Sequence, residues 1–386
     1  MQFCYKQELV RAPPPSQDPT AIYVRTELQF TLGHFKEFPG DKAMPRRAAG
    51  AAILSLALAL PAAAADKPDP APVRAEPVAV KETPFFVFAD TQISYRHVFT
   101  AAEPGNPKLK TADPSDGRDI PKNVLNISHA NAWAYGTNFF SLDILKSASQ
   151  DPAGTRNVIP GQTTLFGYGA AEAYGLYRGT LSGNKITGTT VFAIPGIIKD
   201  VSLSFGFDAN TKNSPFGPNK KLVVGGLVFS VDVPAGFLNV AVHASKEWNR
   251  NGFAVAPYRE VEFNATPEFE IVYSFPLDSL LGGLPLRIAG FNNIVLPKGR
   301  VSTPTSTPTT VEFLSRTNLV LDVGKLIWNQ PGKLDAFVGF QYWRNKFGND
   351  QNYYNRAVTP AIYTTGFSGA GAEEKTFLAG VSIHVF

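Results

Sequence analysis

The chain has 386 residues, a formal charge of +4, 18% charged residues and a single cysteine, with a mean hydropathy of −0.07. One cysteine excludes a disulfide framework and a thiolate metal site. Apolar runs reach only about a dozen residues, which is too short for a membrane-spanning helix. The small positive charge gives no reason to expect a nucleic-acid partner.

A secretory signal peptide is predicted at residues 44–65, inside the chain. Arg46 and Arg47 form its basic region, residues 48–60 its apolar region, and Ala62–Ala65 end its small-residue cleavage site. This pattern predicts export across the inner membrane of a bacterium.

The segments on either side of the signal are interpreted separately from the fold. A signal peptide acts at a free N-terminus, so residues 1–43, which hold Cys4, are interpreted as an upstream extension. The mature chain is expected to begin near Asp66. Residues 66–84 are rich in proline and poor in large apolar residues, which predicts an extended periplasmic tether. The exported remainder, residues 85–386, lacks cysteine and needs a large core or a closed sheet to be stable.

From Phe85 onward, apolar side chains recur at every second position in segments of about ten residues, the pattern of a sheet with two unlike faces. Val201, Leu203 and Phe205, for example, alternate with Asp200 and Ser202. This repetition predicts an all-β fold, a transmembrane antiparallel β-barrel of about 12 strands. The predicted strands are 85–99, 122–131, 136–145, 162–178, 198–209, 220–233, 236–250, 261–275, 284–297, 317–328, 333–345 and 376–386.

Connection lengths support the barrel, because outer-membrane barrels alternate short periplasmic turns with longer external loops. The predicted external loops are long and polar, at 100–121, 146–161, 210–219, 251–260, 298–316 and 345–375. One expected periplasmic connection, Gly179–Ile197, is long and apolar, which predicts that it folds inward or adds a strand. The C-terminal Phe386 is the kind of residue that the barrel assembly machinery recognises.

Three segments carry a family resemblance: YSFPLDSLLGGLPLRIAGFNNIVLPKG at 273–299, FVGFQYWRNKFGND at 337–350 and AWAYGTNFFSLDIL at 132–145. They resemble strands of the nucleoside-specific channel-forming (Tsx-like) outer-membrane family. The resemblance implies a narrow, monomeric barrel of twelve strands that passes nucleosides. Insertions at 301–310 and 353–374 depart from the family pattern.

A barrel of about twelve strands is expected to enclose a slot rather than a wide pore. A nucleoside-selective slot needs aromatic faces for the base and hydrogen-bonding groups for the ribose. The aromatic candidates on the inner face are Phe88, Phe139, Phe291, Phe337 and Trp343. The polar candidates are Asp90, Arg96, Asp143, Glu247, Glu270, Arg287, Asn293 and Gln341. Taken singly, each aromatic could instead pack against an inserted loop, and each charge could pair with another on the wall.

The leading functional hypothesis is a passive channel for nucleosides or similar small polar aromatic solutes, located in the bilayer and lipopolysaccharide of the outer membrane. The main alternative is a structural or surface-interaction barrel whose long loops bind an external partner. His243 and Ser245 have the spacing of a phospholipase His–Ser pair, but the alternation points them into the lumen, away from lipid. We therefore expect no enzyme activity, and the sequence indicates no cofactor and no metal ligand set.

Overall fold

The computed structural model describes residues 85–104, 106, 117–151, 169–214, 217–251, 259–300, 308–352 and 371–385. The predicted extension, signal peptide and tether, and the C-terminal Phe386, lie outside the described residues. The strands are β1 (Phe86–Ala101), β2 (Ile120–Trp133), β3 (Gly136–Ser147), β4 (Ala171–Ser182), β5 (Ile198–Lys212), β6 (Lys221–Val231), β7 (Phe237–Arg250), β8 (Glu260–Glu262), β9 (Thr266–Pro276), β10 (Leu286–Val295), β11 (Glu312–Asp322), β12 (Leu334–Arg344) and β13 (Glu374–His384). The short helices are α1 (Gly183–Thr187), α2 (Val323–Trp328) and the 3-10 turn η2 (Lys346–Gly348).

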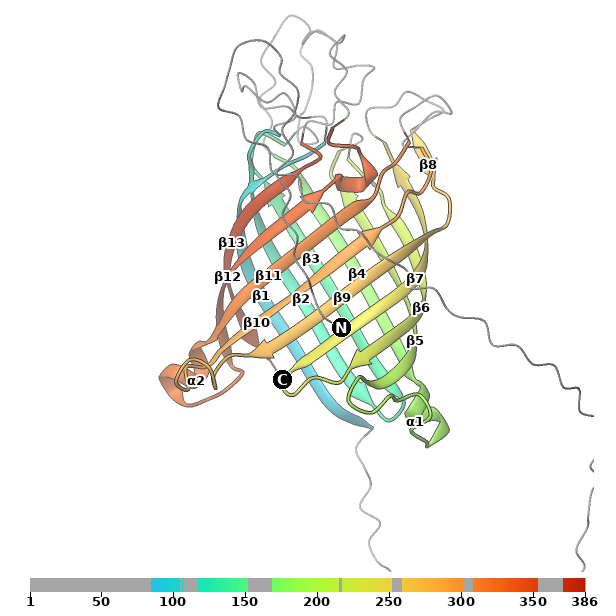
Figure 1. Ribbon diagram of the computed structural model, residues 1–386. Coiled ribbons are helices and arrows are strands. Elements are labelled where there is room, and N and C mark those ends of the chain that lie inside the picture. The colour runs from blue at the N-terminus through green and yellow to red at the C-terminus, as the bar shows by residue number, and fades with distance from the viewer. Residues whose placement is uncertain are drawn as a thin grey trace, which may run out of the picture. The chain divides into compact units, whose positions relative to one another are not determined.

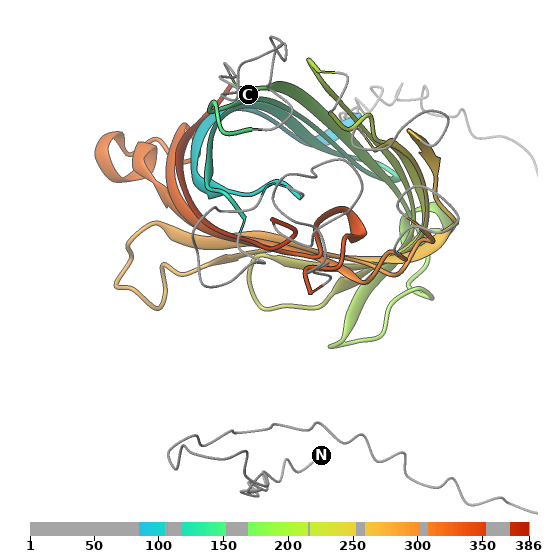
Figure 2. The same cartoon turned by 90° about the horizontal axis from the view of Figure 1, so that it is seen from above.

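The sheet closes on itself because β1 pairs with two strands that are far apart in the sequence (Figures 1 and 2). In its antiparallel ladders, Ile93 faces Ile127 of β2 on one side and Ile383 of β13 on the other. The short β8 pairs only with the far end of β7, where Glu262 faces Trp248. Twelve strands therefore form the ring, which confirms the predicted closed antiparallel barrel.

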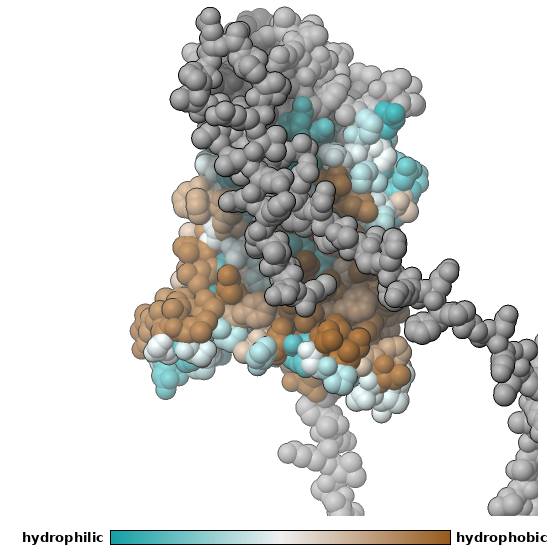
Figure 3. All heavy atoms as spheres, viewed as in Figure 1, coloured by the Kyte–Doolittle hydropathy of each residue, from teal (hydrophilic) through white to brown (hydrophobic). Residues whose placement is uncertain are grey.

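The two faces of the wall differ in polarity, as the alternation predicted. On β12, Val338 and Phe340 are exposed on the outside, whereas Asp335 and Gln341 are buried inside. Apolar side chains cover much of the visible outer surface (Figure 3). The exposed outward set includes Ile93, Tyr95, Leu125, Ile127, Phe140, Ile144, Leu203, Phe205, Phe207, Val223, Leu227, Val242, Phe377, Val381 and Ile383. This polarity is typical of a barrel whose outer face contacts lipid.

The connections between strands form two sets at opposite ends of the barrel (Figure 1). At one end, here called the turn end, the connections are 134–135, 183–197, 232–236, 277–285 and 323–333. At the other, here called the loop end, they are 102–119, 148–170, 213–220, 251–259, 296–311 and 345–373. Among the described residues, no helix has both the length and the apolar character to span a bilayer.

The predicted end of the strand at β4 was wrong, because β4 runs to Ser182 instead of ending at 178. Residues 162–168 of the predicted strand lie outside the described residues, so that part stays a prediction. Residues 179–182 of the predicted connection extend β4, and the remainder, 183–197, begins with the capped helix α1, which lies outside the ring (Figure 2). The Ser182 hydroxyl accepts a hydrogen bond from the Lys185 amide at 3.1 Å, and Gly188 ends α1 in the left-handed conformation.

The predicted strand 317–328 was also wrong in its second half, which forms α2. The carboxylate of Asp322 accepts hydrogen bonds from the amides of Lys325 at 2.7 Å and Gly332 at 2.8 Å. This N-cap starts a helix directly after the strand, and Asn329 closes it at a φ of 54°. A local side-chain cap therefore overrides the apolar alternation of the sequence.

Lipid exposure of the outer face predicts a large effect of charge at Val338, whose side chain is 58% exposed near the centre of β12. Val338→Arg is expected to destabilise the barrel by about 2 to 4 kcal/mol, because a cation there must be moved into hydrocarbon. The measurement is the free energy of unfolding in urea of protein refolded into lipid vesicles. Val338→Leu is the control and should unfold like wild type, and equal stability of the two variants would contradict a lipid-facing Val338.

Candidate functional site

Charged side chains of the inner wall bond to one another across the lumen. The guanidinium of Arg178 on β4 places Nη1 2.6 Å from Asp208 Oδ1 on β5 and Nη2 2.6 Å from Glu270 Oε1 on β9. Three strands, β5, β6 and β7, separate β4 from β9 along the wall. The Arg178 side chain therefore ties together parts of the ring that are not neighbours.

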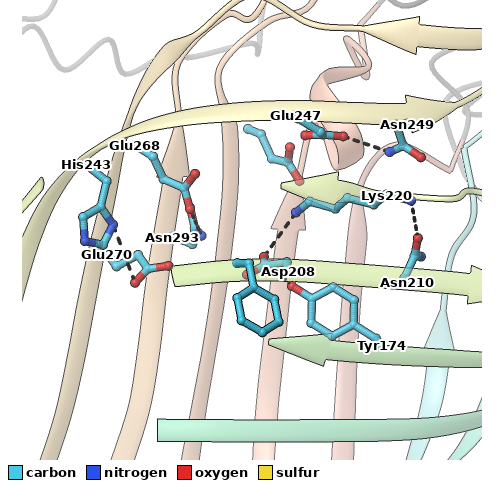
Figure 4. Close-up of polar contacts among 12 residues, drawn as sticks. Tyr174, Asp208, Asn210, Lys220, His243, Glu247, Asn249, Glu268, Glu270 and Asn293 are labelled. Atoms are coloured by element: carbon cyan, nitrogen blue, oxygen red, sulfur yellow. Dashed lines mark hydrogen bonds and ion pairs between the residues drawn. The ribbon is translucent and has the colours of Figure 1, made fainter. Parts of the chain in front are cut away.

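His243 on β7 extends this network. Its Nε2 lies 3.0 Å from the Ser204 hydroxyl. Its Nδ1 lies 3.9 Å from Glu270 Oε2 (Figure 4). Ser245 instead donates to the carbonyl of Thr266 at 3.2 Å. A catalytic His–Ser pair requires a hydrogen bond between its two members, and here each of these described residues has a separate partner.

Strands β5, β7 and β9 carry four inward carboxylates, and several of them are paired with cations such as Lys220, which lies 3.5 Å from Asp208. Figure 4 shows the carboxylates there, which are Asp208, Glu247, Glu268 and Glu270. Lys298 Nζ lies 2.5 Å from Glu247, and Asn293 donates to Glu268 at 2.8 Å. Glu268 is fully buried, and its second oxygen has no partner in the described part of the chain. No group of described His, Cys, Asp and Glu residues has the arrangement of a metal site.

Glu103, just after β1, joins three lysines at the loop end. Its carboxylate lies 2.5 Å from Lys122 Nζ, 3.3 Å from Lys212 Nζ and 3.9 Å from Lys346 Nζ. We call these four residues the loop-end knot. Burial alone would raise the pKa of Glu103, but the three ammonium charges outweigh it and hold that pKa well below its ordinary value. The chain after β1 enters the opening of the ring in the view down the barrel (Figure 2).

Arg316 on β11 is a lumen cation whose contacts are with a neutral side chain and an aromatic ring. Its Nε donates to Gln341 at 2.7 Å, and Gln341 in turn donates to Glu374 at 2.5 Å. The guanidinium lies over the ring of Phe291 on β10, 5.4 Å from its centroid. Among the described residues no carboxylate comes within 4.0 Å of it. Its two terminal nitrogens have no hydrogen-bond partner among the described residues.

The two arginines that the sequence predicted for the lumen, Arg96 and Arg287, are paired. Arg96 on β1 places Nη2 2.5 Å from Asp143 Oδ2 on β3. Near the turn end, Arg287 on β10 forms an ion pair with Asp335 on β12, and His384 Nε2 lies 3.0 Å from the same carboxylate. For these residues the structure therefore shows the alternative stated above, in which each charge pairs with another charge on the wall.

Three of the predicted aromatic residues are covered by protein. Phe337 packs against the buried cluster of Val98, Ala101, Val124 and Leu378 inside the barrel. The Trp343 indole donates to Glu312 at 2.8 Å, and Lys346 Nζ lies 4.4 Å from its ring. Phe291 lies under the Arg316 guanidinium. Phe337 and Trp343 therefore pack against other parts of the protein, which was the alternative to a role in stacking a solute.

Two inward aromatic residues are accessible to solvent. Phe139 on β3 is 41% exposed and lies directly opposite Arg178 in the β3–β4 ladder. Phe88 is 54% exposed near the turn end, and Asp90, two residues further, lies 3.0 Å from the imidazole of His384. An exposed side chain on the inner face requires solvent inside the barrel. The ring of Phe139 is therefore accessible from the lumen.

Each lumen candidate shares the strand parity of a side chain that bonds across the lumen, so it lies on the inner face. A role of these residues in solute binding stays a prediction. The sequence-based prediction missed Arg178, Glu103 and Arg316 as parts of the interior networks. Alternation could have indicated Arg178 and Arg316, because both lie on the polar face of their strands. Glu103 gave no signal, because it lies in a connection to which the alternation does not apply.

No protein-family model matches the chain, and no curated protein sequence matches it. Several solved structures are similar to it. The KdgM porin in complex with disordered oligogalacturonate has 12% identity and a TM-score of 0.33, covering 76% of this chain and 98% of that one. OpdK of Pseudomonas aeruginosa has 10% identity and a TM-score of 0.32, covering 78% and 100%. The NalP translocator domain of Neisseria meningitidis has 11% identity and a TM-score of 0.37, covering 76% and 88%.

Removal of the Arg178 guanidinium is expected to destabilise the barrel strongly. Arg178→Met leaves Asp208 and Glu270 without their shared cation, and breaking a buried ion pair on one side costs about 3 to 5 kcal/mol. The triple variant Arg178→Met, Asp208→Asn, Glu270→Gln should recover most of this loss, because no uncompensated charge remains. Urea unfolding in vesicles measures both variants. Equal stabilities of the single and triple variants would show that the network carries no coupling energy.

The loop-end knot predicts a pH-dependent contribution to stability. The lowered pKa of Glu103 means that its contribution is complete above the ordinary value of 4.5 and is lost as the pH falls through the lower folded value. Glu103→Gln should therefore be less stable than wild type at pH 7, and the difference should shrink below about pH 4. Glu260→Gln is the matched control, because Glu260 is exposed and is paired with Arg250. If the difference in unfolding free energy between wild type and Glu103→Gln stays constant down to pH 3, the lowered pKa assigned to Glu103 is contradicted.

Proposed function

We propose that this barrel is a narrow outer-membrane channel for passive diffusion of small polar solutes, and that nucleosides are the solute class. The observation that carries the proposal is the exposed inward ring of Phe139 beside Arg178. A flat base can stack on such a ring, and the neighbouring guanidinium, carboxylate and imidazole groups can bond a ribose. The resemblance to the Tsx-like family supports the same solute class.

The proposed location rests on the outer face and on the sequence. Apolar side chains alternate outward around the ring, which suits contact with hydrocarbon and with the acyl chains of lipopolysaccharide. The predicted signal peptide of residues 44–65 accounts for export, and recognition of Phe386 by the barrel assembly machinery accounts for insertion. We propose that the barrel works as a monomer, because one ring encloses one lumen.

The proposed selectivity needs only weak contacts. Stacking of a base on one aromatic ring is worth about 1 to 3 kcal/mol, which retains a solute briefly and still allows its release. Around Phe139, the wall supplies donors on Arg178 and acceptors on Glu270, and the Ser204 hydroxyl and His243 can do both. The Arg178 network fixes these groups in position. Further along the wall, the free terminal nitrogens of Arg316 can donate to a base carbonyl.

A closed structural barrel is the second candidate, and the loop-end knot favours it. Glu103 connects β2, β5 and the segment after β12 across the lumen at one end. Lys346 adds an ion pair to Glu374 of β13 at 2.9 Å. If these bonds persist, the barrel is a rigid platform for its long loops.

Single-channel recording in a planar bilayer distinguishes the two candidates. A small conductance that falls on addition of uridine or adenosine supports the channel, and ribose and benzoate separate the contributions of sugar and ring. A barrel that inserts without conducting supports the structural candidate. Glu103→Gln tests whether the knot is the barrier, since its loss should raise the conductance.

The stacking role of Phe139 predicts a weaker nucleoside block after its removal. Phe139→Ala should raise the half-blocking concentration roughly 5- to 150-fold, the equivalent of about 1 to 3 kcal/mol. Phe140→Ala is the matched control, because Phe140 is the next residue on β3 and is exposed on the outer face. Phe291→Ala is expected to weaken the block less, by releasing the Arg316 guanidinium. An unchanged block in Phe139→Ala would remove this residue from the solute path.

A further inference from the structure

Three turn-end connections carry exposed apolar side chains that no strand of the barrel covers. We call this set the apolar skirt. Its members are Ile186, Val191, Phe192, Ile194 and Ile197 around α1, Leu280, Leu281 and Leu284 between β9 and β10, and Leu326, Ile327 and Trp328 on α2. Exposure reaches 74% at Val191, 77% at Leu280 and 63% at Ile327. Connections that faced only water would be expected to be polar.

The skirt points sideways from the barrel. In the view along the barrel axis, α1, α2 and the connection between β9 and β10 lie outside the ring and not across its opening (Figure 2). In the side view, α1 and α2 lie at the turn end, beside the last residues of the strands (Figure 1). Apolar side chains over α2 form a patch that projects beyond the wall (Figure 3). The exposed groups therefore extend in the plane that a surrounding membrane would occupy.

The local structure fits an apolar solvent on one side and water on the other. Both short helices have capped ends, with side chains of Ser182 and Asp322 bonded to their first turns, so few backbone groups lack partners. Each helix also carries one exposed lysine, Lys185 on α1 and Lys325 on α2. An aliphatic lysine stem with its ammonium group among lipid headgroups is common at membrane surfaces.

Aromatic side chains gather at another part of the turn end. Phe85 stacks on Trp133 with centroids 5.6 Å apart, and Tyr135 meets the same indole at 5.4 Å. These rings lie at the start of β1 and at the turn between β2 and β3. Tryptophan and tyrosine are enriched at the level where acyl chains meet headgroups. This cluster places that level at the same end of the barrel as the skirt.

We propose that the apolar skirt lies in the boundary between acyl chains and headgroups of the leaflet at the turn end, where it seats the barrel in the membrane. The proposal rests on the membrane location proposed above. Lipid fits better than a protein partner for two reasons. The three connections leave the ring between different strand pairs, so one compact partner could not cover all of them, and each adjoins the apolar outer wall.

Site-directed spin labelling tests the proposal on the full chain refolded into phosphatidylethanolamine and phosphatidylglycerol vesicles. On a Cys4→Ser background, nitroxides are attached to Val191→Cys, Leu280→Cys and Ile327→Cys. Collision rates with oxygen, which partitions into lipid, and with a water-soluble nickel chelate give the immersion of each label. Lys325→Cys is the matched control on α2, and Val338→Cys reports on the barrel wall. Resistance to dodecyl sulfate at room temperature shows that each variant has folded.

The expected result is an oxygen-to-nickel collision ratio several-fold higher at the three skirt positions than at Lys325→Cys. If the skirt positions give the same ratio as Lys325→Cys while Val338→Cys gives a high ratio, the proposal that the skirt lies in lipid is wrong. The proposed membrane location of the barrel would then still hold. A low ratio at Val338→Cys would overturn the membrane location itself. Skirt labels that are shielded from both oxygen and nickel would indicate a protein contact, which also contradicts the proposal.

Discussion

The pairing of β1 with β13 is the constraint on which the rest of this structure depends. Without it the sheet would have two edges with unpaired amide and carbonyl groups, and in hydrocarbon each such group costs several kcal/mol. Closure satisfies both edges at once and leaves each of the twelve strands of the ring with two neighbours. It also divides the side chains into two populations, because successive residues of a strand must point outward or inward. The apolar exterior and the polar lumen follow from that division.

Closure also explains the density of ion pairs in the lumen. Inward side chains of a twelve-strand ring meet those of the opposite wall over a short distance, with limited room for water. A charge there needs a partner, since an unpaired charge in a poorly hydrated site is costly. Arg178 and the loop-end knot meet this requirement by bridging strands that are not adjacent. The same rigidity holds donors and acceptors in place beside the accessible ring of Phe139, which gives the proposed solute path its selectivity.

The two ends of the barrel follow different physical rules. At the loop end, the chain after β1 brings Glu103 into the lumen, so electrostatics governs the opening. At the turn end, tight caps at Ser182 and Asp322 turn the chain into short helices whose apolar sides face away from the ring. The proposed channel would therefore be lined by charged groups at one end and held in the membrane by apolar contacts at the other.

The sequence by itself determined the fold class and the inner or outer face of each residue in a strand, because both follow from a period of two that closure preserves. It also brought the predicted lumen candidates to the inner face, Phe139 and Glu270 among them. It misplaced the second half of 317–328 and the course of 179–197, where a single side-chain cap outweighs the alternation. Only the tertiary structure decided which inward groups are paired and which remain free. The period of two in the sequence gives the face of the sheet on which a residue lies. It does not give the position of the residue along the barrel axis or its partner across the ring, because these depend on strand register, tilt and closure.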